Sequence, residues 1–216
     1  ARLTNTVEMP YLCLLVSGGH TQILVAEDID RYKRFGTTLD DALGEAFDKT
    51  AKMMGLPYPG GPHMQKLAQD YQARCAKNGQ DPNAIIAKYD LPLPLTHQKN
   101  LDFSFSGLKT AMRKHIDAID SDIIEQHDAE ELAYAFHQAV IKVLEKKLTR
   151  AIAMFKESYG DTLDAQNITP SLVVAGGVAA NSYIRAALED LTAAHNMTLI
   201  APPVKLCSDN GAMIAW

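Results

Sequence analysis

Two pairs of adjacent glycines follow short apolar runs and could hold a phosphate group. Gly18-Gly19 comes after the run Tyr11–Val16, and Gly176-Gly177 comes after Leu172–Ala175. Because glycine has no Cβ, the backbone N–H groups around it can approach an anion closely. A helix predicted after the second pair would add unpaired N–H groups and a positive dipole. For a lone Gly-Gly pair, an ordinary tight turn is the alternative.

Three polar side chains are candidates for contact with a ligand or a metal. Asp48 falls late on an amphipathic pattern, where it would either pair with Lys52 at i+4 or bind a ligand. Asn181 follows the second glycine pair, where it would cap a helix or bond a ligand. Asp209 lies at another predicted helix start, as a cap or, with histidines from elsewhere, as a metal ligand.

The histidines do not form a metal motif. There are seven, and their spacing contains neither HxxxH nor HExxH, so zinc-protease chemistry of that kind is not predicted. The second glycine pair does not match GxGxxG, so a dinucleotide-binding fold is not indicated. No side chain stands out as a general base, and the catalytic residues stay unassigned.

Apolar patterns predict the strands and helices that must position these residues. Strands are expected at 11–16, 21–26, 31–36, 172–175 and 198–201. Helices are expected at 38–54, 63–76, 107–115, 128–156 and 179–194, and from 208 onward. Segment 57–62 (PYPGGP) is predicted to be a rigid turn whose glycines use their free φ, and 79–100 and 159–169 to be connections.

The order of these elements predicts the fold class. The β-β-β-α order at the start is consistent with a ribonuclease-H-like half-domain in an α/β protein. The first two strands would form a hairpin around Gly18-Gly19. Both glycine pairs would then end strands that face a common crevice, and that crevice would hold a nucleotide or phosphate.

Composition and charge narrow the classes of function. No apolar run of this 216-residue chain approaches the about 20 residues needed to cross a bilayer, so no membrane partner is expected. Three scattered cysteines without CxxC spacing indicate a reducing, cytoplasmic location. The formal net charge of −5 gives no overall attraction to nucleic acid, so RNA binding would need a local basic patch or a partner.

Basic residues on two predicted helices are the candidates for such a patch. Charge on an exposed helix face is usually only solvated, and RNA contact is the sharper alternative. The candidates are Lys109, Arg113, Lys114, Lys142, Lys146, Lys147 and Arg150.

Several stretches, taken in order, resemble one enzyme family. They are LVSGGHT, GEAFDKTAK, YPGGP, LDFSFSGLKT, AGGVAAN and SDNGAMIAW. In this order they are similar to the bacterial form of the tRNA threonylcarbamoyltransferase family, formerly called O-sialoglycoprotein endopeptidase or glycoprotease. The resemblance runs from about Tyr11 to Trp216 and indicates a fragment that lacks the family's start and C-terminal tail.

The resemblance implies a fold, a domain division and a reaction. The fold would be the ribonuclease-H-like half of the actin and sugar-kinase (ASKHA) ATPase type. It would span 11–216, with 62–127 as a mostly helical insertion and 1–10 as a leader or a remnant of a missing domain. The family moves a threonylcarbamoyl group from threonylcarbamoyl-adenylate to N6 of the adenosine 3′ of the anticodon, in tRNAs that read codons beginning with A.

The family's motifs also imply site residues at the matching positions. Substrate contacts would fall on Leu15, Val16, Ser17, Gly18, Gly19, Asp48, Gly61 and Asn181. Gly176 and Gly177 would contact the nucleotide, and Asp209 would be the carboxylate ligand of a single iron(II) ion, Fe2+. The family's two histidine ligands belong to an HxxxH motif upstream of the first strand, and 1–10 contains no histidine. The fragment is therefore expected to hold metal poorly and to be inactive alone.

The resemblance implies partners as well. They are tRNA, threonylcarbamoyl-adenylate or ATP/AMP, a shorter paralogous subunit and a P-loop ATPase subunit. Two alternative functions stay open: a metal-dependent glycoprotein endopeptidase, which is the family's historical interpretation, and a non-catalytic nucleotide-binding module.

Overall fold

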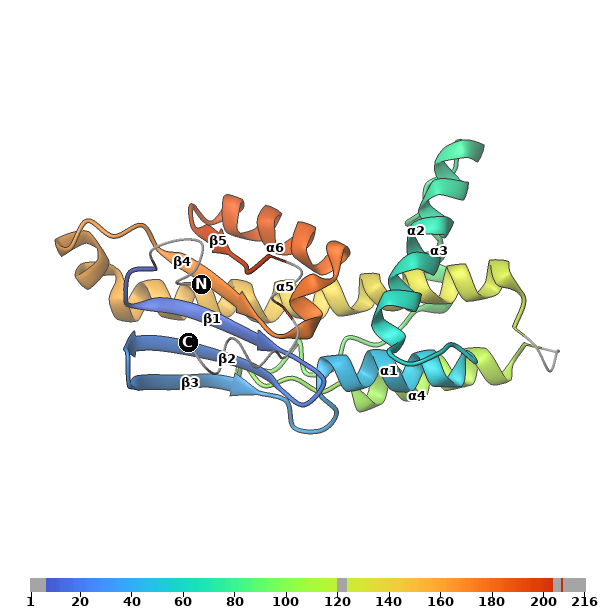
Figure 1. The fold of residues 1–216 in the computed structure, drawn as a ribbon, viewed down its shortest axis with the longest axis horizontal. Coiled ribbons are helices and arrows are strands. Elements are labelled where there is room, and N and C mark those ends of the chain that lie inside the picture. The colour runs from blue at the N-terminus through green and yellow to red at the C-terminus, as the bar shows by residue number, and fades with distance from the viewer. Residues whose placement is uncertain (1–6, 120–123, 204–206, 208–216) are drawn as a thin grey trace.

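A computed structural model describes residues 7–119, 124–203 and 207 of the chain (Figure 1). The strands are β1 (Tyr11–Val16), β2 (Thr21–Asp28), β3 (Arg31–Thr37), β4 (Ser171–Ala175) and β5 (Thr198–Ile200). The helices are α1 (Leu43–Met53), α2 (Gly60–Asn78), α3 (Ala84–Tyr89), α4 (Ser106–Asp117), α5 (Gln126–Ala165) and α6 (Ser182–Ala194). A short 3₁₀ turn, Gly177–Ala180, lies between β4 and α6.

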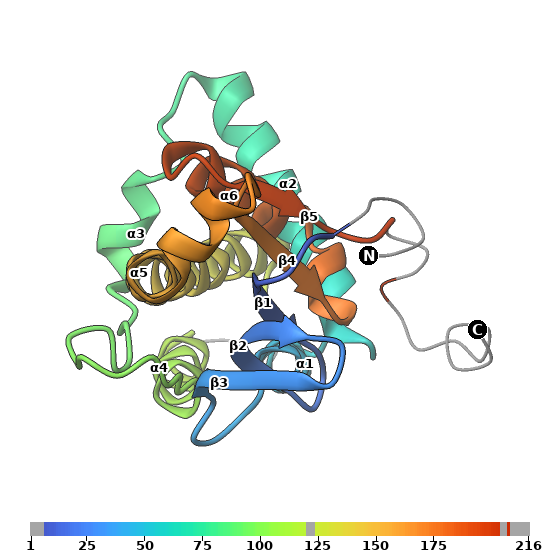
Figure 2. The same cartoon turned by 90° about the vertical axis from the view of Figure 1, so that its left-hand side faces the viewer.

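The strands form one five-stranded sheet in the order β3-β2-β1-β4-β5. β1 pairs antiparallel with β2, and β2 with β3, whereas β4 runs parallel to β1 and β5 parallel to β4. Helices pack around this sheet and extend beyond it (Figures 1 and 2). The predicted α/β class with a ribonuclease-H-like half is confirmed. Because β1 and β4 are parallel neighbours, their carboxyl ends meet at one edge of the sheet.

Helix α5 runs the length of the molecule, behind the sheet and then alongside α2 (Figure 1). Its 40 residues span about 60 Å at 1.5 Å per residue. The prediction of a connection at 159–169 was wrong, because α5 continues to Ala165. Tyr159 packs on Phe155 with 5.3 Å between ring centroids and donates a hydrogen bond to Glu27, and Leu163 is buried. These contacts hold the segment helical.

The helix predicted from Thr38 begins only at Leu43. The five residues before it join another part of the chain: Thr38 bridges Phe103, and the N–H of Leu39 donates to the Phe103 carbonyl at 2.9 Å. Thr38 is therefore paired with segment 103–106 and residues 39–41 form a bend, so the helix cannot start at Thr38. Gly55, with φ 74°, ends α1 as predicted.

The predicted PYPGGP turn is the start of α2, so that prediction was wrong from Gly60 onward. Gly60 is the first helical residue, and its φ is not in the left-handed region. A Cβ on Gly60 would stand 2.3 Å from the Cβ of Ala51, so α1 and α2 cross too closely there for a side chain. Packing between helices, rather than backbone freedom, requires this glycine.

Smaller differences lie elsewhere. The 79–100 connection contains α3, and α6 begins at Ser182 rather than Ala179. The helix predicted from Ser208 lies outside the described residues. The division into 1–10, 11–216 and an insertion at 62–127 stays a prediction. Among the residues described, no helix combines the length and apolar character needed to span a membrane.

Candidate functional site

The two glycine pairs lie side by side at one edge of the sheet. Leu15 of β1 is opposite Ala175 of β4, so the chain leaves both strands at the same edge. Gly176 has φ 101°, and a Cβ on it would stand 2.1 Å from the carbonyl oxygen of Val16. Only glycine lets the strand ends approach so closely. The structure thus brings the two pairs together, as an adenylate site shared between them requires.

Ser17 builds the turn that carries the first pair. Its Oγ accepts hydrogen bonds from the N–H groups of Gly19 at 3.2 Å and His20 at 3.0 Å. Gly18 and Gly19 are exposed, and a Cβ on either would meet nothing within 4 Å. The fold itself therefore does not require these two glycines, whereas a ligand that approaches the backbone would. Val16 is fully buried, and the substrate contact implied for it stays a prediction.

Helix α1 begins against this turn. The N–H of Gly44 donates to the Ser17 carbonyl at 3.1 Å, and a Cβ on Gly44 would come within 2.7 Å of the same oxygen. The N–H of Leu43 donates to Oγ1 of Thr21 at 2.8 Å, so the buried Thr21 hydroxyl caps the helix. Gly44 was missed from the sequence, although a glycine within an amphipathic helical pattern is a signal of close packing.

Asp48 connects α1 to the start of α2. Its Oδ1 accepts a hydrogen bond from the N–H of Gly60 at 2.7 Å, which is neither of the two roles predicted for it. A carboxylate at a helix N-terminus satisfies an otherwise unpaired donor and complements the helix dipole. Gly61, the next residue, has open space where a Cβ would stand. Asp48 and Gly61 therefore flank the same helix start.

The start of α6 is not the open anion seat that was predicted. Asn181 Oδ1 accepts from the N–H groups of Tyr183 at 3.1 Å and Ile184 at 3.2 Å. The third donor, the N–H of Ser182, is taken by Gln65 Oε1 at 2.9 Å. The capping role weighed for Asn181 is confirmed. In the part of the chain that the structure describes, the unpartnered donors near the second glycine pair are the N–H groups of Gly177 and Val178 instead.

His137 of α5 holds the other end of the Asn181 amide. Its Nε2 lies 3.0 Å from Asn181 Nδ2, and its Nδ1 lies 2.7 Å from the Ala133 carbonyl oxygen. Nδ1 therefore carries the proton, and Nε2 accepts from the amide. Complete burial, between the rings of Phe47 and Tyr183, lowers the pKa of His137 to about 4. The residues around His137 give no signal of this role, because its partner Asn181 lies 44 residues away in the sequence.

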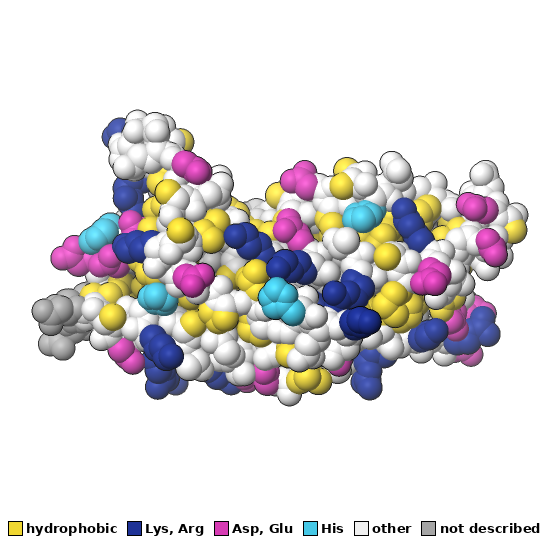
Figure 3. Space-filling view, turned by 180° about the vertical axis from the view of Figure 1, so that it is seen from behind, with side chains coloured by type: hydrophobic (Ala, Val, Ile, Leu, Met, Phe, Trp, Pro, Cys, Tyr) yellow, Lys and Arg dark blue, Asp and Glu magenta, His cyan; other side chains and the backbone are white. Residues whose placement is uncertain are grey.

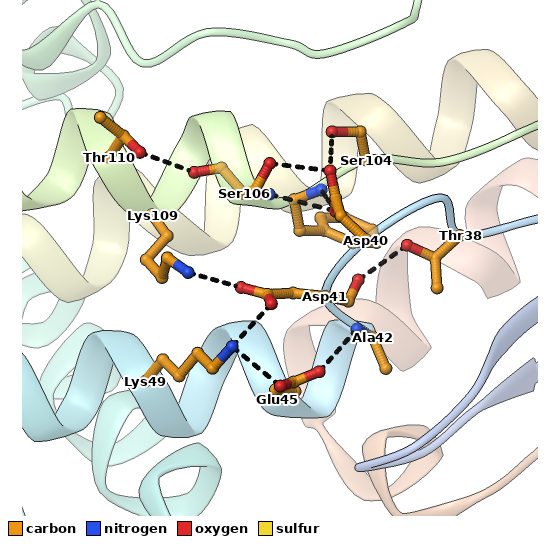
Figure 4. A network of polar contacts seen from close by, with 11 residues as sticks. Thr38, Asp40, Asp41, Ala42, Glu45, Lys49, Ser104, Ser106, Lys109 and Thr110 are labelled. Atoms are coloured by element: carbon orange, nitrogen blue, oxygen red, sulfur yellow. Dashed lines mark hydrogen bonds and ion pairs between the residues drawn. The ribbon is translucent and has the colours of Figure 1, made fainter.

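Two adjacent aspartates tie the loop before α1 to α4 (Figure 4). Asp40 Oδ1 accepts from the N–H groups of Phe105 at 2.8 Å and Ser106 at 3.2 Å, and so caps α4. Burial alone would raise the pKa of Asp40, but these and the seryl hydrogen bonds outweigh it and lower the pKa. Asp41 accepts from Lys49 at 2.7 Å and Lys109 at 2.9 Å. Lys109 was a candidate for RNA contact and is instead in this ion pair.

The described residues do not form a metal site. Within 7–119, 124–203 and 207, no three histidine, cysteine, aspartate or glutamate side chains gather as a ligand set. The predicted metal ligand, Asp209, lies outside the described residues. Cys207 is described: a Cβ on Gly177 would lie 3.9 Å from its carbonyl oxygen. The chain just before the predicted ligand therefore returns to the second glycine pair.

Comparison with known proteins agrees with the family resemblance of the sequence motifs. The family model for TsaD, described as tRNA N6-adenosine threonylcarbamoyltransferase, matches residues 1–216. Proteins of that name from Brucella ovis, Brucella canis and Brucella abortus are each 49% identical to the chain over 217 aligned positions. The match covers 100% of this chain and 55% of each relative. The chain thus spans about half the length of the curated relatives it matches.

Proposed function

Because the chain belongs to the tRNA N6-adenosine threonylcarbamoyltransferase family, we propose that the full-length protein transfers threonylcarbamoyl groups to tRNA. The donor would be threonylcarbamoyl-adenylate. The acceptor would be N6 of the adenosine 3′ of the anticodon, in tRNAs that read codons beginning with A. In this reaction the new N6–carbamoyl bond replaces the carbamoyl–phosphate bond, AMP leaves, and the amine loses one proton.

The observation that carries the proposal is the meeting of the two glycine pairs at the ends of β1 and β4. Gly18 and Gly19 leave open space on one side, and Gly177 and Val178 offer unpartnered N–H donors on the other. Backbone donors without intervening Cβ atoms suit the phosphate of an adenylate. A nucleotide held between these turns would lie next to the helix start that Asp48 and Gly61 flank.

The proposed chemistry needs an activated acyl group more than a strong base. The exocyclic amine of adenine is a weak nucleophile, so the carbamoyl group must arrive as a mixed anhydride with a good leaving group. Donors fixed around the phosphate would stabilise the charge that develops on AMP as it leaves. Asn181 is held by His137, so its amide is fixed before any ligand binds. We assign no general base.

The iron(II) ion that the resemblance implies does not fit the described residues by themselves. Asp209 would supply one ligand, and the two histidines would have to come from upstream of β1. When bound, such an ion would polarise the carbamoyl carbonyl or the phosphate oxygens. From the same resemblance we propose that the protein works with a shorter paralogous subunit and a P-loop ATPase subunit. We also propose that it is located in the cytoplasm.

Reconstitution of the full-length protein tests the proposal. It would be mixed with threonylcarbamoyl-adenylate, a tRNA transcript that reads a codon beginning with A, and the two partner subunits. Nucleoside analysis by mass spectrometry should then find threonylcarbamoyl-modified adenosine next to the anticodon, and none in a transcript whose adenosine is replaced. An unmodified base in a mixture that forms the product with a Brucella relative would reject the proposal.

The same preparation separates the two alternatives. Chelator-sensitive cleavage of a glycoprotein by rigorously purified protein would favour the endopeptidase. Calorimetric binding of ATP or AMP without any transfer would favour the nucleotide-binding module. Neither alternative is favoured by the names of the relatives, which are those of a transferase.

A further inference from the structure

A row of basic side chains crosses the face of the molecule opposite to that in Figure 1 (Figure 3). On α5 it comprises Lys142, Lys146 and Arg150, spaced at i, i+4 and i+8. Residues at this spacing lie on one ridge of a helix, here about 6 Å apart along the axis at 1.5 Å per residue. Lys146 is exposed, and the other two are partly exposed. The row is therefore a linear array of accessible positive charge.

A second segment, 97–100, adds to this row although it lies far away in the sequence. The buried ammonium of Lys147 donates to the Asn100 carbonyl at 2.9 Å, and the Arg150 guanidinium donates to the Gln98 carbonyl. These bonds hold the exposed side chains of His97 and Lys99 beside α5. Lys147 thus holds segment 97–100 against α5 and is not accessible to RNA. Its prediction as a candidate for RNA binding was wrong.

The cations of the row are not neutralised by ion pairs. Among the described residues, the lysines and arginines within 4 Å of a carboxylate do not belong to the row; they are Arg31, Lys49, Lys66, Arg74, Lys88 and Lys109. Arg150 contacts carbonyl oxygens, and Lys99, Lys142 and Lys146 form no ion pair with any described residue. Glu145 lies close enough to Lys142 for the lysine to lower its pKa, although burial raises that pKa overall. The chain as a whole has a formal net charge of −5, so this row is a positively charged region on a negatively charged protein.

A hollow of about 430 Å³ lies at one end of the row. Lys142 and His97 line it together with Asp90, and its remaining lining is apolar: Ile86, Leu91, Pro92, Leu93, Ala135 and Ala139. Aliphatic side chains beside cations suit a ligand that carries flat bases next to phosphates.

We propose that this basic face, consisting of Lys99, Lys142, Lys146, Arg150 and the adjoining hollow, is where the protein binds the phosphate backbone of its RNA substrate. The inference rests on the proposed function, which names tRNA as the acceptor. Phosphate contacts supply most of the affinity for nucleic acid and position it without reading its sequence. The linear spacing fits a strand of phosphates, and the hollow accepts an unstacked base.

The test compares two variants of the full-length protein with equal changes in charge. The first carries Lys99→Gln, Lys142→Gln and Lys146→Gln, and leaves Lys147 and Arg150 to hold segment 97–100. The control carries Lys33→Gln, Lys52→Gln and Lys77→Gln, which are exposed lysines on β3, α1 and α2. Binding of an unmodified tRNA transcript is followed by fluorescence anisotropy across a salt series, and thermal unfolding shows that both variants are folded.

The basic-face variant should bind the transcript at least about tenfold more weakly at low salt, with a salt slope smaller by about 2 to 3. The control should keep the parent's affinity to within about threefold. Equal affinity and slope in both variants would overturn the proposal. Retained tRNA binding with loss of a partner subunit would also overturn it, in favour of an acidic protein surface. If the parent forms no modified adenosine but the binding difference persists, the proposed function fails and the basic face stands.

Discussion

Burial makes the charge of His137 part of the folding equilibrium. Its folded pKa of about 4 lies below the value of 6.5 expected in the unfolded chain, so between these values the unfolded state binds more protons. The stabilisation is therefore complete above pH 6.5 and is lost as the pH falls toward 4. The difference corresponds to about 3 kcal/mol in the free energy of unfolding. Protonation would also put a donor at Nε2, where the Asn181 amide now donates.

Two substitutions of His137 distinguish the role of Nδ1 from that of Nε2 and test the pH dependence of stability. His137→Gln can place an oxygen near the Nε2 position and keep the contact with Asn181, whereas His137→Asn reaches only toward Nδ1. Urea unfolding at pH 7.5 and pH 5 should show a smaller pH dependence in both variants than in the parent. Adenine nucleotide binding, measured by calorimetry, should survive better in His137→Gln. The same pH dependence in parent and variants would show that His137 is not its source.

Of the glycines at the sheet edge, Gly176 is required by packing, whereas Gly18 would be required only by a ligand. Gly176→Ala puts a Cβ 2.1 Å from the Val16 carbonyl oxygen at φ 101°, so we expect a loss of at least about 2 kcal/mol in the free energy of unfolding. Gly18→Ala meets open space and should change it by less than about 0.5 kcal/mol. Gly18→Ala should nevertheless weaken AMP binding in calorimetry. Unchanged nucleotide affinity in that stable variant would remove the first turn from the site.

Among the elements, the start of α2 depends on a residue of α1. Asp48→Ala removes the acceptor for the Gly60 N–H and should reduce the free energy of unfolding by about 1 to 2 kcal/mol. Asp48→Asn keeps an oxygen acceptor and should lose less than about 1 kcal/mol. If the carboxylate also contacts the substrate, Asp48→Asn should reduce transfer activity much more than it reduces stability. Equal activity of Asp48→Asn and the parent would leave Asp48 as a helix cap only.

Elements with a long local pattern were predictable from the sequence, and those set by distant contacts were not. The apolar run of β1 and the helical stripe of α5 can each be recognised from the residues of that element alone. The path of segment 38–42 depends on Phe103, and the last turns of α5 depend on Glu27. These partners lie more than 60 residues away, and the patterns inside each segment favour a helix or a connection instead.

The candidate site shows the same division. The two glycine pairs could be placed at strand ends because each follows a short apolar run. Gly44 and His137 have roles only once α1 and α5 are in place, since their partners are Ser17 and Asn181. The start of α6 was misjudged for a related reason: one of its donors, the N–H of Ser182, is taken by Gln65, a side chain of α2.

At the scale of the whole molecule, α5 belongs both to the sheet and to the helices beyond it. It lies behind the sheet (Figure 1), and it packs against α6 as well as against α2 and α3. Unfolding α2 would uncover α5 residues that it now covers, among them the buried Tyr134, whose ring centroid lies 5.0 Å from that of Tyr71 on α2. Because helical stability in proteins comes mostly from tertiary packing, α5 should not keep its contacts with α6 while it loses those with α2 and α3.

We therefore expect the sheet and helices α2–α5 to open as one cooperative unit, although 62–127 was predicted to be an insertion. Native-state hydrogen exchange of the full-length protein in low urea, read by mass spectrometry, can decide this. Peptides from β1 and from Gly60–Asn78 should give opening free energies within about 1 kcal/mol of each other and the same dependence on urea. If α2 opened at a much lower free energy while β1 stayed protected, the helices would form a separate unit. In that case the buried contacts of α5 with α2 would contribute little to stability.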